Sequence, residues 1–170
     1  KTVAMLAKAR GVHVLNLVRR DAGVQELAAL GIGNALSTAQ PDWQERARAI
    51  LGGPLARAAV DSIGGSASAS LLGLLGEEGT LVSFGTMAGE PMQIDSGSLI
   101  FKQATVKGFW GSKVSQAMTP DNKRRLIGEL LQRVLWKLSI PRGSFPLLLA
   151  LFGALKDVGG TVTAGGQRLR

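Results

Sequence analysis

The 170-residue sequence contains no cysteine and no tyrosine, and it has a single histidine, His13. The lack of cysteine excludes a disulfide framework and any thiolate metal site. One histidine cannot build a zinc site alone, so we expect no metal centre and assign His13 a partly exposed surface role. A chain without cysteine also fits a reducing compartment, and we therefore expect a cytoplasmic protein.

The sequence also lacks an apolar run long enough to cross a bilayer. The most apolar stretch, FPLLLALFGAL at residues 145–155, has eleven residues, whereas a membrane-spanning helix needs about 20. We interpret this stretch as a buried helix or an interface and expect no membrane association. The amino end reads as an amphipathic helix, which differs from a charged tip followed by an apolar core, so we expect no secretory signal.

Aromatic residues make up only 5% of the chain, while the net charge is +8. A basic chain raises the question of nucleic-acid binding. The positive charges are scattered, however, and no aromatic residues interleave with them. We therefore expect no nucleic-acid partner, and a basic interaction domain remains a third hypothesis behind the two developed below.

What the sequence does contain is an alternation of helical patterns with short apolar strands. We expect helices at residues 2–11, 23–31, 41–53, 66–79 and 119–138, a helical turn at 96–102, and strands at 12–18, 34–38, 58–65, 80–89 and 105–111. Helices that alternate with strands apolar on both faces indicate a parallel sheet with helices on both sides. Right-handed crossovers then give a doubly wound, Rossmann-type α/β domain, which is the fold class we predict.

Doubly wound sheets bind ligands at the carboxyl ends of their strands. In this chain those ends read VRRD, SIGG, FGTMAG and GFWG. At these motifs the sequence resembles the cofactor domain of the medium-chain dehydrogenase/reductase superfamily, in the zinc-free branch of quinone oxidoreductases and 2-enoyl thioester reductases. The run AKARGVHVLNLVRRDAGVQELAALG matches the family's second strand and following helix, VDSIGG its fourth strand, and GTLVSFGTMAGEPMQ its fifth. SLIFKQATVKGFWGS is especially similar to the enoyl reductases.

The resemblance covers residues 1–138 and implies an incomplete dinucleotide-binding domain there. Residues 139–170 would then be a segment that normally packs on a catalytic domain. The family's first strand and its glycine-rich loop are expected immediately before Lys1, outside this chain. In the strand order 3-2-1-4-5-6 that strand is central, so the strands at 12–18 and 58–63 would lack a shared partner.

The same resemblance places the catalytic domain upstream as well. In enoyl thioester reductases that domain carries a catalytic tyrosine, and this chain has no tyrosine. We therefore expect no catalytic residue in the chain and no activity from its 170 residues alone.

The opening Lys1–Thr2 permits another interpretation, as the end of a phosphate-binding P-loop, whose pattern finishes in glycine-lysine-serine/threonine. Such an NTPase needs an aspartate after an apolar strand to hold magnesium. Asp61 in AAVDSIGG is the sole candidate. This interpretation leaves the paired arginines and the GFWG turn unexplained.

Arg19 and Arg20 bear on the choice of cofactor. NAD-specific folds place an acid at the end of the second strand, where it bonds the ribose hydroxyls. Counted against the family, Val18 occupies that position here and the two arginines follow it. A carboxylate would repel a 2′-phosphate, whereas arginines bind it well. We therefore expect NADPH as the cofactor, the alternative being a solvated loop.

The resemblance implies further cofactor-binding residues at the other strand ends. They are Gly64 and Gly65, Gly85, Thr86 and Met87, and Phe109, Trp110 and Gly111. Alternatives remain open, because the glycine pair also fits a plain turn, and the two aromatic residues also fit core packing at a strand end.

Two hypotheses follow. In the first, the chain is the NADPH-binding portion of a zinc-independent oxidoreductase that transfers hydride to a small-molecule substrate, an enoyl thioester or a quinone or enone. In the second, it is a truncated, non-catalytic nucleotide-binding or protein-interaction module, acting through a surface on residues 122–155. We leave a homodimer open in both.

Overall fold

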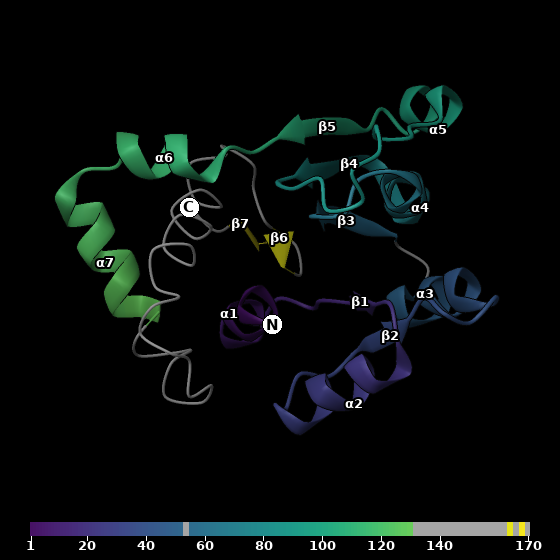
Figure 1. Ribbon diagram of the computed structural model, residues 1–170, viewed down its shortest axis with the longest axis horizontal. Helices are drawn as coiled ribbons and strands as arrows, with labels where there is room; N and C mark the ends of the chain where they lie inside the picture. Colours follow the sequence, from purple (N-terminus) through teal and green to yellow (C-terminus); the bar gives the residue numbers. More distant parts are fainter. Residues whose placement is uncertain (53–54, 131–162, 165–166, 169–170) are drawn as a thin grey trace. The chain divides into compact units, whose positions relative to one another are not determined.

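The computed structural model of the protein describes residues 1–52, 55–130, 163–164 and 167–168 (Figure 1). The chain divides into two compact units. The first comprises Lys1–Ser37 and the residues from Trp110 onward, and the second is Thr38–Phe109. The expected domain border between residues 138 and 139 and the apolar stretch at 145–155 lie outside the described residues.

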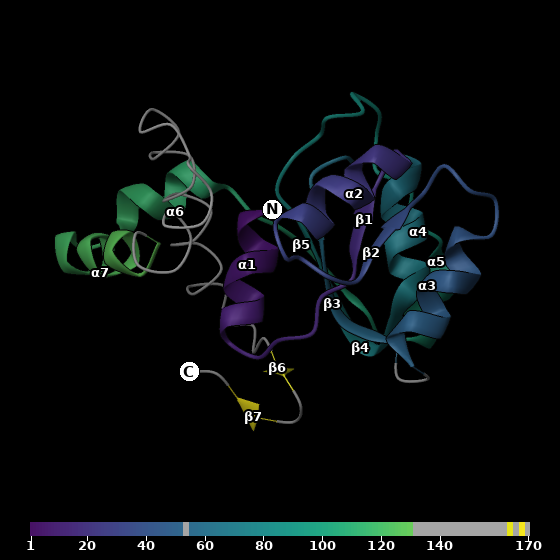
Figure 2. The same ribbon diagram turned by 90° about the horizontal axis from the view of Figure 1, so that it is seen from below.

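The first unit is built around two short parallel strands. Its elements are α1 (Thr2–Ala9), β1 (Asn16–Val18), α2 (Asp21–Ala29), β2 (Ala35–Ser37), α6 (Gly111–Ala117), α7 (Pro120–Leu130), β6 (Thr163–Ala164) and β7 (Gln167–Arg168). β1 pairs in parallel with β2, so that Leu17 lies opposite Leu36. Figure 2 shows α2 lying alongside both strands. β6 and β7 form a separate antiparallel pair.

Apolar side chains of α1, α2 and α7 form the core of this unit. The buried members are Ala4, Met5, Leu6, Leu27, Ile32 and Leu130. Polar contacts at the C-terminal end of α1 support the same packing. The Lys8 ammonium donates to the carbonyl oxygen of Gly31 at 2.7 Å, and Arg10 forms an ion pair with Glu129 of α7.

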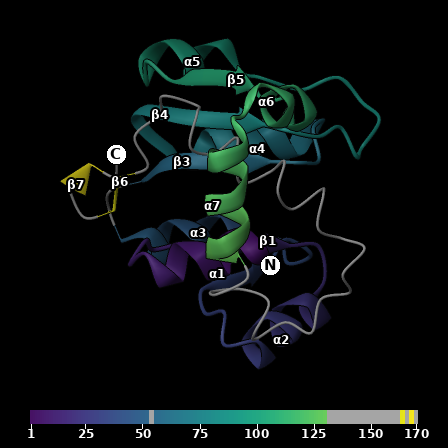
Figure 3. The same cartoon turned by 90° about the vertical axis from the view of Figure 1, so that its left-hand side faces the viewer.

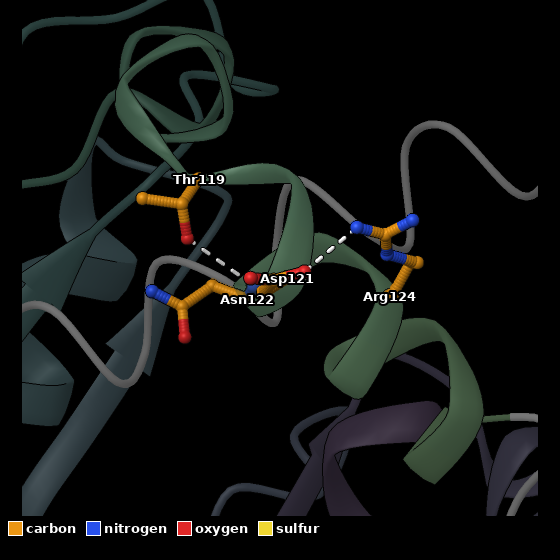
Figure 4. Close-up of polar contacts among 4 residues, drawn as sticks. All are labelled: Thr119, Asp121, Asn122 and Arg124. Carbon is orange, nitrogen blue, oxygen red and sulfur yellow. Dashed lines mark hydrogen bonds and ion pairs between the residues drawn. The ribbon is translucent and has the colours of Figure 1, made fainter.

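The N-terminus of α7 carries the signals expected of a helix start (Figure 4). Thr119 precedes Pro120, and its hydroxyl accepts a hydrogen bond from the backbone N–H of Asn122 at 3.3 Å, as an N-cap residue does. Arg124 donates to Asp121 at 2.7 Å on the exposed surface. The predicted start of the helix at residue 119 is therefore confirmed, and its expected continuation from 131 to 138 lies outside the described residues.

The second unit contains a three-stranded parallel sheet in the order β3–β4–β5. Its elements are α3 (Trp43–Leu51), β3 (Ala56–Asp61), α4 (Ser66–Leu74), β4 (Leu75–Ser83), α5 (Ser96–Phe101) and β5 (Thr105–Gly108). Figures 1 and 3 show the three strands side by side. Ala59, Leu81 and Val106 share one register row. They pack with the fully buried Leu72 of α4 and Leu75, so this helix covers that face of the sheet.

The alternation of helices with parallel strands confirms the predicted α/β fold class. β1 and β3, which the sequence analysis expects to lack a shared partner, belong to different sheets. Among the described residues, each of the two pairs on one side only, β1 with β2 and β3 with β4. In the described part of the chain no helix is both long and apolar enough to cross a membrane.

The helix expected over residues 66–79 is shorter in the structure, where α4 ends at Leu74. The Lys102 ammonium donates to three carbonyl oxygens at this end, those of Leu72 (3.0 Å), Gly73 (3.0 Å) and Leu75 (2.8 Å). Such carbonyls have no partner within a helix. Burial, and to a lesser degree the charge of Arg48, lowers the pKa of Lys102. A contact made across 27 to 30 residues of sequence thus closes the helix.

Candidate functional site

The three strands of the second unit end in register at one edge of their sheet. Asp61 of β3 lies opposite Ser83 of β4, and Ser83 lies opposite Gly108 of β5. Because parallel strands share a direction, the loops that follow them all begin at this edge, where doubly wound folds bind ligands. We call residues 62–65 the β3 loop and residues 84–94 the β4 loop.

Backbone hydrogen bonds join the β3 loop to the β4 loop along their length. Three of these hydrogen bonds run from Phe84 N to Asp61 O (2.9 Å), from Met87 N to Ser62 O (3.1 Å) and from Ala88 N to Ile63 O (2.8 Å). Farther along, Gln93 N donates to Gly65 O at 3.1 Å. The two loops are therefore joined into one connected piece of backbone.

Glycine is required at three positions of this connected backbone. Gly64 and Gly65 have φ of +78° and +56°, the region that residues with a Cβ rarely adopt. Gly85 is needed for a different reason, since a Cβ there would lie 2.8 Å from the carbonyl oxygen of Ser62. A Cβ on Gly65 would also lie 3.1 Å from Oε2 of Glu90. All three glycines were candidates from the sequence, and the structure brings them together.

Asp61 supports the β3 loop through its side chain, a role that the sequence did not reveal. Its side chain is 1% exposed. Oδ1 accepts hydrogen bonds from the backbone N–H groups of Ile63 (2.8 Å) and Gly64 (3.2 Å), and Oδ2 accepts one from the hydroxyl of Ser68 (2.6 Å). Because both oxygens are taken by protein donors, the geometry gives no support to a magnesium ligand here.

The remaining candidates of the second unit lie at the same edge. Thr86 and Met87 are exposed in the β4 loop, and the Met87 side chain is 74% exposed. The N–H of Phe109 donates to the carbonyl oxygen of Ser83 at 2.7 Å, which extends the pairing of β5 with β4 past its last residue. Phe109 itself is half-buried.

Trp110, Gly111, Arg19 and Arg20 belong to the first unit. The Trp110 side chain is 70% exposed, so core packing does not account for it. Arg19 and Arg20 follow β1 directly and are both exposed. Among the described residues neither arginine forms an ion pair, although the charge of Arg20 contributes, after Lys1, to lowering the pKa of Glu26. Within the same residues no set of three His, Asp or Glu side chains could hold a metal ion.

The family model described as "Zinc-binding dehydrogenase" matches residues 1–126. The chain is 30% identical over 151 residues to the mitochondrial enoyl-[acyl-carrier-protein] reductase of Dictyostelium discoideum, an alignment that covers 85% of this chain and 43% of that protein. A putative NADPH:quinone reductase from Bacillus thuringiensis superposes with a TM-score of 0.68 at 20% identity, over 80% of this chain and 40% of that one. The Escherichia coli quinone oxidoreductase complexed with NADPH gives a TM-score of 0.54 at 29% identity, covering 62% of this chain and 32% of that one.

The chain thus spans less than half the length of these proteins. The structural likeness confirms the predicted Rossmann-type fold class. Our expectations about individual cofactor residues, domain borders and the cytoplasm stay predictions, and the Dictyostelium relative carries a mitochondrial designation. The chain belongs to the zinc-binding dehydrogenase family of the medium-chain dehydrogenase/reductase superfamily, in which it resembles the zinc-free branch of enoyl and quinone reductases.

Proposed function

We propose that this chain is the NADPH-binding part of an oxidoreductase that transfers hydride to an activated carbon–carbon double bond. The observation that carries the proposal is the edge at which three parallel strands end in register under two joined glycine loops. Family membership supports an oxidoreductase, and one similar protein is a quinone oxidoreductase complexed with NADPH. The substrate we propose is an enoyl thioester or a quinone or enone.

The glycine loops fit a dinucleotide because they keep side chains away from the edge of the sheet. Added side chains at Gly65 and Gly85 would meet atoms of the neighbouring loop, and bare backbone allows close approach of a pyrophosphate or ribose. We assign Gly64 and Gly65 to the adenosine side of the cofactor. The exposed Thr86 and Met87 we assign, with Gly85, to its nicotinamide side.

Phe109, Trp110 and Gly111 complete the proposed nicotinamide side through their backbone. The cofactor, when bound, supplies the hydride, and the chain supplies binding and orientation. We assign no general acid to the described residues. The alternative of a non-catalytic nucleotide-binding module would be favoured if the chain binds NADPH but does not turn over enoyl thioesters or quinones, even as part of a full-length protein.

Arg19 and Arg20 are proposed to select NADPH over NADH. Both are exposed and, among the described residues, lack an ion-pair partner, and a charge-assisted hydrogen bond to a phosphate is worth about 1.5–3 kcal/mol. The double variant Arg19→Ala/Arg20→Ala should therefore bind NADPH about 10- to 100-fold more weakly. Its affinity for NADH, which lacks the 2′-phosphate, should stay the same.

A matched control is available in the same unit. Arg124 and Arg125 are also adjacent, exposed arginines, and they lie on α7. Arg124→Ala/Arg125→Ala removes the same two charges, so it corrects for the general attraction of a basic chain for an anion. We expect it to leave the preference for NADPH unchanged. Equal losses in the two double variants would remove Arg19 and Arg20 from the site.

A further inference from the structure

Asp61 and Ser68 lie on either side of the β3 loop at the candidate edge, although neither was a sequence candidate for cofactor binding. Asp61 is the last residue of β3, and Ser68 lies in the first turn of α4. Both side chains are buried, at 1% and 0% exposure, and their hydrogen bond is 2.6 Å long. A carboxylate is costly to bury unless its oxygens are hydrogen-bonded, and here all the partners come from one short segment.

The carboxylate of Asp61 links three parts of the chain at once. It extends from the end of β3, it accepts from two backbone N–H groups of the β3 loop, and it accepts from α4 through Ser68. The loop between them contains Gly64 and Gly65, both with positive φ. Two successive glycines have wide conformational freedom, so a turn built from them needs fixed contacts to hold one shape.

We propose that Asp61 and Ser68 are positioning residues that hold the Gly64–Gly65 turn in the conformation that receives the cofactor. The inference rests on the proposed function, because it assigns the turn to NADPH. Neither side chain is proposed to touch the cofactor. They act by keeping a large fraction of molecules in the binding-competent shape, and apparent affinity falls in proportion to that fraction.

Three substitutions separate the contributions of the pair. Asp61→Ala removes the acceptor for all three hydrogen bonds and should weaken NADPH binding by about tenfold or more, as expected if the turn adopts its competent shape one time in ten. Ser68→Ala removes one bond and leaves Oδ2 of Asp61 without its partner, so its effect should be smaller. Asp61→Asn can keep every bond, because Oδ1 still accepts from the loop and Nδ2 donates to the Ser68 hydroxyl. Affinity should return to within about threefold of the original.

Lys102 provides the control for a loss of stability alone. Its ammonium donates to three carbonyls at the C-terminal end of α4, the end away from the glycine turn. Lys102→Met therefore disturbs the same helix by a comparable number of hydrogen bonds. We expect it to lower the stability of the protein and to leave the dissociation constant for NADPH within about twofold of the original value.

The experiment measures NADPH affinity by fluorescence titration, and amide hydrogen exchange at Ile63 and Gly64, in the chain and its four variants. The proposal is supported if Asp61→Ala shows faster exchange and weaker NADPH binding than the unsubstituted chain. The exchange rate and the affinity should both be preserved in Lys102→Met and restored in Asp61→Asn. If Asp61→Ala does not fold, Ser68→Ala against Lys102→Met gives the same comparison.

Two outcomes would overturn the inference, and they are distinguishable. An unsubstituted chain that does not bind NADPH contradicts the proposed function and the inference with it. Normal binding by the unsubstituted chain, together with unchanged affinity in Asp61→Ala and Ser68→Ala, leaves the proposed function standing and refutes the positioning role alone.

Discussion

Gly85→Ala tests whether the two glycine loops depend on close backbone approach. The added Cβ would lie 2.8 Å from the carbonyl oxygen of Ser62, 3.3 Å from its Cα and 3.4 Å from its carbonyl carbon. All three atoms are backbone, so no side chain can rotate out of the way. The loops must separate, and the hydrogen bond from Met87 N to the same carbonyl oxygen, 3.1 Å long, lies directly at the point of strain.

The expected cost follows from these contacts. Forcing one methyl group into a well-packed place costs about 1–3 kcal/mol. Weakening the Met87–Ser62 hydrogen bond adds up to about 1 kcal/mol. We therefore expect Gly85→Ala to lower the free energy of unfolding by about 1–4 kcal/mol, measured by urea denaturation. NADPH binding should weaken as well, because the β4 loop carries the proposed nicotinamide contacts.

Gly73→Ala is the matched control in the same unit. Gly73 lies in α4, and a Cβ there would meet no atom within 4 Å. Alanine is favoured over glycine within helices, so this variant should gain up to about 1 kcal/mol. A Gly85→Ala protein as stable as the original, with unchanged NADPH affinity, would refute the close-approach argument.

Two further predictions concern the second unit. Leu81→Ala removes a fully buried side chain that packs on Leu72 and Leu75, and should cost about 2–5 kcal/mol in urea denaturation; a loss well under 1 kcal/mol would contradict that core. Hydrogen bonds from the Ser98 side chain and from the backbone of Ser98 and Gly97 hold the pKa of Asp95 below its ordinary 3.8. Because the folded pKa is the lower one, this cap stabilises α5 fully above pH 3.8, and the stabilisation is lost as the pH falls from there through the folded pKa. Acid unfolding curves should therefore show a smaller loss for Asp95→Asn, and identical curves would exclude the cap as a source of acid sensitivity.

Much of the fold could be predicted because the local signals agree with the tertiary structure. The strand expected at 34–38 is β2, Ala35–Ser37, and the helix expected at 41–53 is α3, Trp43–Leu51. Gly52 caps the C-terminus of α3, and its φ of +70° fits the glycine stop signal. Such elements depend on apolar spacing and on glycine, both of which are visible in the sequence.

Other boundaries depend on contacts between distant residues and were predicted wrongly. The strand expected over 12–18 is paired only over Asn16–Val18, opposite Ala35–Ser37 of β2. The early end of α4 depends on Lys102, which no local pattern indicates. α6 was not predicted at all, since GSKVSQA begins with glycine and offers a single large apolar side chain, Val114.

The candidate site was likewise visible only in part. The family resemblance at the strand ends pointed to Gly64, Gly65 and Gly85, and the structure gives each glycine a physical reason. Asp61 drew notice in the sequence only as a candidate magnesium ligand in the P-loop interpretation, and Ser68 reads as one of several serines in SASAS. Their pairing needs the turn between β3 and α4 to be folded, so the three-dimensional arrangement alone reveals it.

The most direct test of the central claim is a parallel titration of the protein with NADPH and with NADH, followed by tryptophan fluorescence. The chain contains three tryptophans, which include the exposed Trp110 of the proposed nicotinamide side. We predict saturable binding of NADPH at least about tenfold tighter than that of NADH, as one charge-assisted phosphate contact provides. Equal affinity for the two would contradict the role of Arg19 and Arg20, and no binding of either would contradict the account as a whole.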